Sequence, residues 1–203
     1  YVVACLSGVF SIEHALMLVA ERARLMNLTE NGAMLSVAAS QALVTSELRY
    51  MDVDALDIAA VNGQESVVLS GSKRDIVRAT QHFEVQGHST RELVTSHAFH
   101  SRYLDPILEA FKQTLERVTF NAPHSTYISS LTGEVVTADL VTDVDYWCRQ
   151  LRHTVQFSRS VETLVDAGTQ CVLDLGPSNV AGMLVQGNSK DLAVINCSGN
   201  IKQ

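Results

Sequence analysis

The sequence predicts an α/β protein made of two parts. Between residues 33 and 96, segments typical of strands and amphipathic helices follow in the order β-α-β-β-α-β, the ferredoxin-like arrangement. Towards the C-terminus, short apolar runs alternate with helical segments, which is typical of a mainly parallel sheet. A chain of 203 residues, 46% hydrophobic and 18% charged, can bury the core of one domain with a small inserted subdomain.

The first residues predict the end of a helix. YVVACLSG is an apolar run closed by Gly8, a residue typical of the position just after a helix. Domains rarely begin in this way, so we expect further residues upstream of Tyr1. Ser11 is a suitable N-cap for a helix over 12–26. The apolar residues that recur in it at helical spacing are Leu16, Val19, Ala20, Ala23 and Met26.

Residues 33–96 are expected to form a compact subdomain. AMLSVAA (33–39) predicts a strand, and Ser40 caps a helix over 40–51. LDIAAV and SVVLSG flank the turn NGQE and predict a hairpin. An amphipathic helix over 72–86 ends at Gly87, and TRELVTS (90–96) predicts the last strand.

The segment from residue 97 onwards returns to the larger part. A helix is expected from Ser101, with Pro106 in its first turns, where proline is tolerated. STYISSLTGEVV (125–136) predicts strand, turn and strand, and DYWCRQL and SRSVETLVDAG predict helices. CVLDLGP (171–177) and LAVINCS (192–198) predict strands on either side of a short helix.

Charge and apolar patterning exclude several classes of function. The formal net charge is −7 and no basic cluster is present, so we expect no nucleic-acid partner. An anionic ligand would need a local cation, since the charge balance offers no general attraction. No apolar run is long enough to span a membrane, and no signal peptide is evident. The four cysteines are scattered, which predicts buried free thiols in a cytoplasmic protein and no metal site.

The stretch GHSTRELVTSHAFHS (87–101) contains two candidate catalytic positions. Gly87-His88-Ser89 has the start of a nucleophile elbow, in which a strand leads into the serine and a helix leaves it. Here the predicted order is reversed, and the position two after Ser89 is Arg91, not a small residue. We therefore interpret Gly87 as a helix cap and His88-Ser89 as turn residues.

The second candidate is His100, which lies between a predicted strand and a predicted helix. The positive end of a helix dipole disfavours imidazolium, so this histidine is expected to be neutral and able to accept a proton. A single histidine before a helix is more often a cap or a surface residue, so spacing alone does not establish catalysis.

Several motifs along the chain resemble those of one family, in the expected order. They are YVVACLSGVFSIEHALMLVAERARLM, NGAMLSV, AAVNGQESVVLSG, SHAFHS, YWCRQLRHTVQFSRSVETLV and CVLDLGPSNVAGML. Together they resemble the acyl-CoA:acyl carrier protein transacylases of fatty acid synthases and the acyltransferase domains of modular polyketide synthases. The resemblance implies an α/β-hydrolase-like core, incomplete at its N-terminus, over 1–32 and 97–203. The ferredoxin-like small subdomain would be inserted at 33–96.

The resemblance also assigns roles to single residues. His100 resembles the catalytic base, and Arg22 the arginine that holds the malonyl carboxylate. A planar guanidinium suits a carboxylate and supplies the missing local cation. Without the resemblance, Arg22 is better explained as a solvated helix charge like Arg24.

Four more residues resemble positions that line the family's cleft. Phe99 stands where methylmalonyl-using relatives have a smaller residue, and His97 takes the place of their tyrosine, which points to malonyl. Simple core packing also explains Phe99. Gln156 resembles a glutamine at the active-site edge, and Asn62 an asparagine of the cleft, although a turn asparagine beside Gly63 is equally ordinary.

The implied activity is malonyl transfer from malonyl-CoA to the phosphopantetheine thiol of an acyl carrier protein, through an acyl-serine, in polyketide or fatty acid biosynthesis. A covalently linked ketosynthase is an expected partner, and no bound cofactor or metal is expected. The family's GHSxGE elbow is absent and would fall directly before Tyr1. The chain alone is therefore expected to be inactive.

Two other classes stay open from the sequence. One is an inactive binding or scaffolding fragment that docks a carrier protein. The other is a hydrolase that releases acyl groups to water, which Arg22 disfavours because a carboxylate clamp suits a dicarboxylic acyl group.

Overall fold

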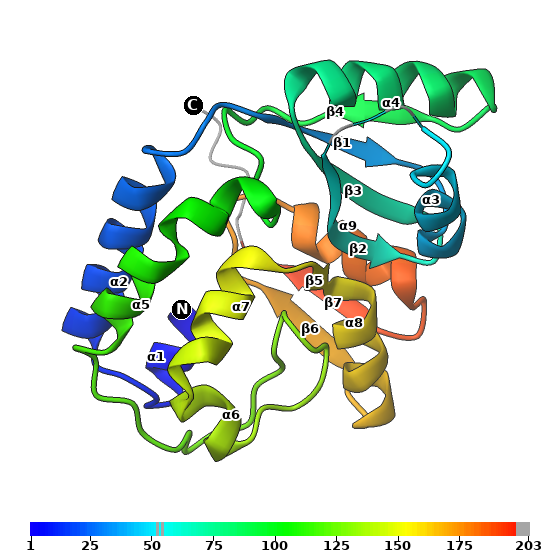
Figure 1. Cartoon of the computed structure of the whole chain (residues 1–203). Helices are drawn as coiled ribbons and strands as arrows, with labels where there is room; N and C mark the ends of the chain where they lie inside the picture. Colours follow the sequence, from blue (N-terminus) through cyan, green and yellow to red (C-terminus); the bar gives the residue numbers. More distant parts are fainter. Residues whose placement is uncertain (52, 54, 198–203) are drawn as a thin grey trace, which may run out of the picture.

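The computed structural model describes residues 1–51, 53 and 55–197. It is an α/β protein in which a mixed five-stranded sheet lies beside a group of helices and a two-stranded parallel sheet (Figure 1). None of the described helices combines the length and the apolar character needed to cross a membrane.

The five-stranded sheet is built almost entirely from residues 33–92. Its order is β4-β1-β3-β2-β5, with β5 parallel to β2 and the other pairs antiparallel. The strands are β1 Ala33–Val37, β2 Leu56–Gly63, β3 Ser66–Gly71, β4 Thr90–Glu92 and β5 Val155–Gln156. Helices α3 Gln41–Glu47 and α4 Lys73–Val85 belong to the same segment (Figure 1).

Side chains alternate between the two faces of this sheet, as a strand requires. On one face, Leu35 and Leu69 are buried against Ile76 and Phe83 of α4. On the other face, Met34, Ala59 and Val68 form a separate cluster that Phe99 contacts. This second face therefore lies towards the segment that carries His100.

A separate core holds the helices of the larger part together. Its helices are α1 Val2–Leu6, α2 Ile12–Met26, the 3₁₀ helix η1 Arg102–Ile107, α5 Leu108–Leu115, α6 Ala138–Thr142 and α7 Val144–Arg152. Phe10 and Trp147 lie at the centre of this core with ring centroids 5.3 Å apart, and Tyr1 and Phe120 flank them.

The C-terminal segment forms the second sheet. α8 Phe157–Asp166 and α9 Val180–Asn188 accompany β6 Cys171–Asp174 and β7 Ala193–Asn196, which pair in parallel. The Asp174 carboxylate accepts hydrogen bonds from the backbone of Gly176 and Gly182, both at 2.9 Å. This fixes the turn between β6 and α9.

Local signals placed most elements correctly. Ser11, Ser40 and Ser72 cap α2, α3 and α4 by accepting hydrogen bonds from backbone N–H groups. Gly8 and Gly87 both adopt the left-handed conformation expected after a helix, with φ of 81° and 86°. In each case the next residue donates back to the last turn, Val9 to Ala4 and His88 to Phe83, which completes a Schellman motif.

Some expectations were wrong, and others hold only in part. Residues 125–136 form only an isolated bridge between Ile128 and Val135. The parallel arrangement expected at the C-terminal end is present for β6 and β7, and Ser198 of the last predicted strand lies outside the described residues. Cys171 and Cys197 are exposed. The helix expected from Ser101 starts as 3₁₀ before α5, with Pro106 inside that turn.

The buried face of α2 also differs from the prediction. Leu16 and Val19 of the expected apolar stripe are exposed, whereas Leu18 and Leu25 are buried. Arg22 lies between these two along the helix, four residues after Leu18 and three before Leu25, so it belongs to the inward face. Helix periodicity alone identified the apolar stripe but not the face that this chain covers.

The two capping glycines provide a stability test. A Cβ at Gly8 would lie 2.6 Å from Cδ2 of His124, whereas nothing lies within 4 Å of one at Gly87. Both substitutions force an L side chain into positive φ, at about 1–2 kcal/mol. We expect Gly8→Ala to lower the free energy of unfolding by about 1 kcal/mol more than Gly87→Ala in urea titrations. Equal losses would show that His124 moves aside freely.

Candidate functional site

The loop that returns from the five-stranded sheet to η1 carries His100. Ser101 closes this turn, because its hydroxyl donates to the carbonyl of Ala98 at 2.6 Å and accepts from the N–H of Tyr103 at 3.3 Å. Gly32 also donates to the carbonyl of Ser96 at 3.0 Å. Within this fixed turn His100 has φ of 54°, a left-handed conformation uncommon outside glycine.

The His100 ring is anchored through one nitrogen. Its Nδ1 lies 3.0 Å from the backbone carbonyl of His153. A carbonyl only accepts, so Nδ1 carries the hydrogen, and in the neutral ring Nε2 is left as an acceptor. The pKa of His100 is lowered to about 4, first by burial and then by the charge of Arg22, while the bond to His153 opposes the shift. The ring is therefore neutral at physiological pH.

This neutrality was expected from the sequence, but its cause is different. The prediction relied on the dipole of a helix that follows His100. The structure places a short 3₁₀ turn there, and burial and the Arg22 cation are the main causes. His153 was missed, because a backbone carbonyl has no signature in the sequence.

Arg22 presents an unpaired guanidinium nitrogen in the interior. Its Nε is buried without a hydrogen-bond partner among the described residues, and its guanidinium lies 5.6 Å from the centre of the Tyr1 ring. Arg24, on the same helix, is exposed and donates to both carboxylate oxygens of Glu21 at 2.8 and 2.7 Å. Burying an unpaired polar group is costly, so Arg22 is set apart from an ordinary surface charge.

His97 and Phe99 lie in the same turn as His100. Their rings stack with centroids 6.0 Å apart and an angle of 28° between planes. His97 is buried, and its Nδ1 lies 2.7 Å from the hydroxyl of Ser96. Phe99 packs against the cluster of Met34, Ala59 and Val68. These contacts fix both rings beside the His100 segment.

Gln156 and Asn62 are neighbours across the sheet. Gln156, on β5, pairs with Val61 of β2, and its N–H donates to the carbonyl of Ser130 at 2.8 Å. Asn62 follows Val61, and its carbonyl accepts from Nδ2 of Asn188 at 2.6 Å. Asn62 lines a cavity of about 410 Å³ with residues of the β2–β3 turn, α8 and α9. That cavity is not lined by His100 or Arg22.

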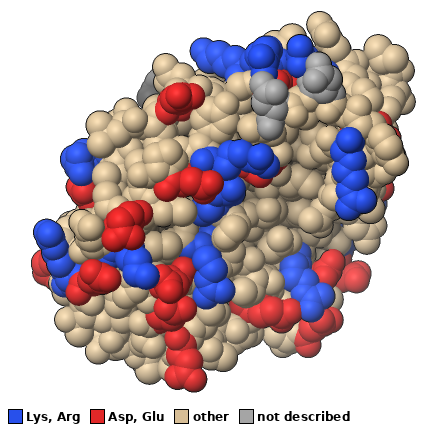
Figure 2. Space-filling view, in the orientation of Figure 1, with Lys and Arg blue, Asp and Glu red and all other residues tan. Residues whose placement is uncertain are grey.

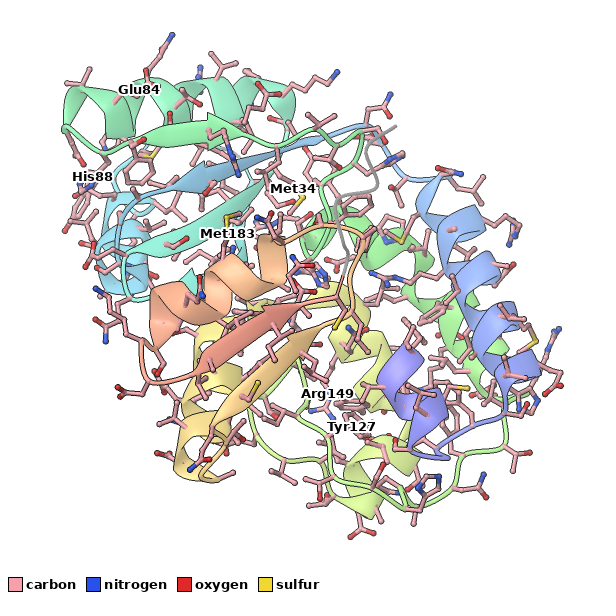
Figure 3. All side chains as sticks on the ribbon, turned by 180° about the vertical axis from the view of Figure 1, so that it is seen from behind. Met34, Glu84, His88, Tyr127, Arg149 and Met183 are labelled. Carbon is pink, nitrogen blue, oxygen red and sulfur yellow. The ribbon has the colours of Figure 1, made fainter. Side chains whose placement is uncertain are left out.

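The Gly87-His88-Ser89 stretch has the geometry of a helix cap. α4 enters it and β4 leaves it, the reverse of a nucleophile elbow. Nδ1 of His88 donates to the carbonyl of Ala38 at 3.0 Å. His88 lies near the end of α4, on the opposite side of the molecule from α2 (Figure 3). This stretch is therefore separate from Arg22.

A metal site would require charged groups elsewhere in the chain to lie close together. Among the described residues, no group of three or more His, Cys, Asp or Glu side chains is placed to hold a metal ion. On the face shown in Figure 2, acidic and basic side chains are interspersed rather than gathered by sign. The chemistry available at His100 and Arg22 is thus proton transfer beside a cation.

Comparisons with known proteins agree on the family. The family model described as "Acyl transferase domain" matches residues 1–202. Polyketide synthase GfsA of Streptomyces halstedii is 40% identical over 181 residues, which is 89% of this chain and 2% of that protein.

Two solved structures share the fold. The acyltransferase domain from the second module of the salinomycin polyketide synthase is 37% identical, with a TM-score of 0.86 over 95% of this chain and 46% of that one. The acyl transferase domain of SpnD, solved with 2-(pent-4-yn-1-yl)malonyl, is 30% identical, with a TM-score of 0.89 over 98% of this chain and 48% of that one. The chain thus spans about half the length of these solved domains. From its matched residues and its fold, it belongs to the acyl transferase domain family.

Proposed function

We propose that this chain is part of a domain that transfers a malonyl group from malonyl-CoA to the phosphopantetheine thiol of an acyl carrier protein. The observation that carries the proposal is a neutral, anchored imidazole within the electrostatic influence of Arg22, whose Nε is buried without a partner among the described residues. Malonyl transfer needs both a base for the chemistry and a cation for the free carboxylate. The malonyl-type ligand of the SpnD domain supports this substrate class.

The proposed reaction proceeds in two matching halves. Nε2 of His100 accepts the proton of a serine hydroxyl as its oxygen attacks the thioester carbonyl, and the proton then passes to the departing CoA thiolate. The carrier's phosphopantetheine thiol next gives its proton to Nε2 and takes the acyl group from the serine. The family resemblance assigns the nucleophile to the serine of a GHSxGE elbow, a motif that residues 1–203 do not contain, so the tests below use a complete domain that carries this motif.

We also propose the finer architecture that the sequence suggested. Residues 33–96 would form a ferredoxin-like subdomain inserted into an α/β-hydrolase-like core made of 1–32 and 97–203. Support comes from the β4-β1-β3-β2 order and from the separate apolar clusters of the two parts. The exposed apolar side chains of Leu16 on α2 and Ile195 on β7 would pack against the rest of the core.

Four further residues are proposed to line the acyl groove. Phe99 and His97 lie in the turn that carries His100 and would limit the space beside the α-carbon of the acyl group. Gln156 lies on β5, three residues after His153, and would lie at the edge of the acyl groove. Asn62 would line the groove from β2, the strand that pairs with β5. An acyl carrier protein and a linked ketosynthase are the proposed partners.

His100 provides the central test. In the complete domain, His100→Ala should lower kcat/KM for malonyl transfer by about 10²- to 10⁴-fold, because the base is lost. His88→Ala is the matched control and should leave the rate unchanged. The wild-type rate should fall on acidification only well below pH 6.5, since the Nε2 acceptor is lost as pH drops through a pKa of about 4. A fully active His100→Ala enzyme would remove the proposed function.

Arg22 and Arg24 offer a matched pair on one helix. Arg22→Ala should reduce kcat/KM for malonyl-CoA by about 10- to 100-fold, the value of a charge-assisted hydrogen bond to a carboxylate, and leave acetyl-CoA almost unaffected. Arg24→Ala removes an exposed pair with Glu21 and should change neither rate. Initial rates with the two thioesters measure the difference. Equal losses on both substrates would mean that Arg22 does not hold the carboxylate.

Phe99 is tested by its effect on selectivity. Phe99→Ala opens space in the turn, so the methylmalonyl-to-malonyl ratio of kcat/KM should rise by about 10-fold, within the range that one methyl group usually allows. Competition between the two thioesters measures this ratio. A wild-type enzyme that uses both equally would show that Phe99 serves only core packing.

A further inference from the structure

Both ends of the hydrogen bond that orients His100 are connected to the same side chain. That side chain is Asp57 on β2, a residue to which neither the sequence nor the family assignment gave a role. Asp57 contacts Arg102, two residues after His100, and Arg152, which directly precedes His153.

The contact with Arg102 involves both carboxylate oxygens. Oδ2 of Asp57 accepts from the backbone N–H of Arg102 at 2.7 Å and from its Nε at 3.1 Å, and Oδ1 accepts from its Nη2 at 2.9 Å. The backbone bond matters most for His100, because it fixes the main chain just beyond the left-handed residue. A strained conformation persists only where its surroundings hold it in place.

The contact with Arg152 fixes the other end. Nη2 of Arg152 lies 3.8 Å from Oδ2 of Asp57, and its Nε donates to Asp105 of η1. On the far side of His153, the Thr154 hydroxyl donates to the carbonyl of Ile58 at 2.6 Å. The His153 carbonyl, which accepts from His100, is therefore flanked by residues tied to positions 57 and 58 of β2.

This network is partly shielded from water. The side chain of Asp57 is 19% exposed and that of Arg152 is 17% exposed. Burial alone would raise the pKa of Asp57, but the hydrogen bonds from Arg102 and the charges of Arg102 and Arg152 hold it below its ordinary value. Asp57 is therefore ionised at neutral pH. Partly buried, bidentate pairs of this kind are stronger and more directional than exposed ones.

We propose that Asp57 is a positioning residue for proton transfer by His100. Through Arg102 and Arg152 it holds the His100 ring and the His153 carbonyl at hydrogen-bonding distance. It thereby maintains the tautomer that carries hydrogen on Nδ1 and leaves Nε2 free to accept a proton. This inference rests on the proposed function of His100 as the base.

The test is Asp57→Asn in the complete domain, with Glu134→Gln as the matched control. Oε1 of Glu134 accepts hydrogen bonds from Nε and Nη2 of Arg159 at 3.0 and 2.6 Å. Its substitution therefore weakens another arginine–carboxylate pair, one that does not involve the His100 segment. We expect Asp57→Asn to lower kcat for malonyl transfer by about 10- to 100-fold, with KM for malonyl-CoA within about twofold. Imidazole ¹⁵N NMR should show an increased Nε2–H population for His100. Glu134→Gln should leave both measurements unchanged.

A purely structural role would lower the melting temperature without moving the tautomer or kcat, and that result would overturn the inference. If Asp57→Asn does not fold, Arg102→Gln keeps the backbone bond to Asp57 and removes the two guanidinium bonds. Arg102→Gln should lower kcat and raise the Nε2–H population of His100, each by less than Asp57→Asn does. If neither kcat nor the tautomer population changes, the inference is also overturned.

A His100→Ala arm separates the two proposals. If His100→Ala retains the wild-type rate, the proposed base is wrong, whatever Asp57 does. If His100→Ala abolishes transfer while Asp57→Asn retains both kcat and the Nδ1–H tautomer, only the positioning role fails.

Discussion

The hydrogen bond from Nδ1 of His100 to the carbonyl of His153 determines what this site can do. It joins two segments that lie 53 residues apart in the sequence, and it decides which ring nitrogen remains available to accept a proton. Burial and the nearby Arg22 keep the ring uncharged, so the acceptor is present at neutral pH. Three features hold that one contact in place. They are the turn closed by Ser101, the end of α7 at Arg152 and the bond from Thr154 to Ile58 of β2.

Arg22 differs from the other arginine of α2 in where its guanidinium lies. The face of α2 that carries Leu18 and Leu25 takes Arg22 into the interior, where its Nε has no partner among the described residues. Arg24, two residues away, satisfies its guanidinium with Glu21 in solvent. The same cation that would attract a carboxylate also keeps the neighbouring imidazole neutral. The proposed binding and proton-transfer roles would thus share one charge, although burial of the ring is the larger cause of its neutral state.

The sequence predicted the features that depend on nearby residues and missed those that depend on distant ones. Serine caps and left-handed glycines act within a single turn, so Ser72 and Gly87 marked the two ends of α4 correctly. The strands expected over 125–136 have adequate composition, but backbone pairing there is limited to one bridge. The family motifs pointed to His100 and Arg22, and the roles of these two residues, like those of the other lining residues, stay predictions. Neither the His153 carbonyl nor Asp57 could be found, because nothing local distinguishes them.

The two residues of β5 have a mechanical consequence for the molecule. They come from the larger part of the chain but extend the sheet of the smaller part, where Val155 and Gln156 pair with Ala60 and Val61. The Thr154 hydroxyl adds a second link beside this pairing by donating to the carbonyl of Ile58. The two parts are therefore joined through backbone pairing as well as through the covalent chain.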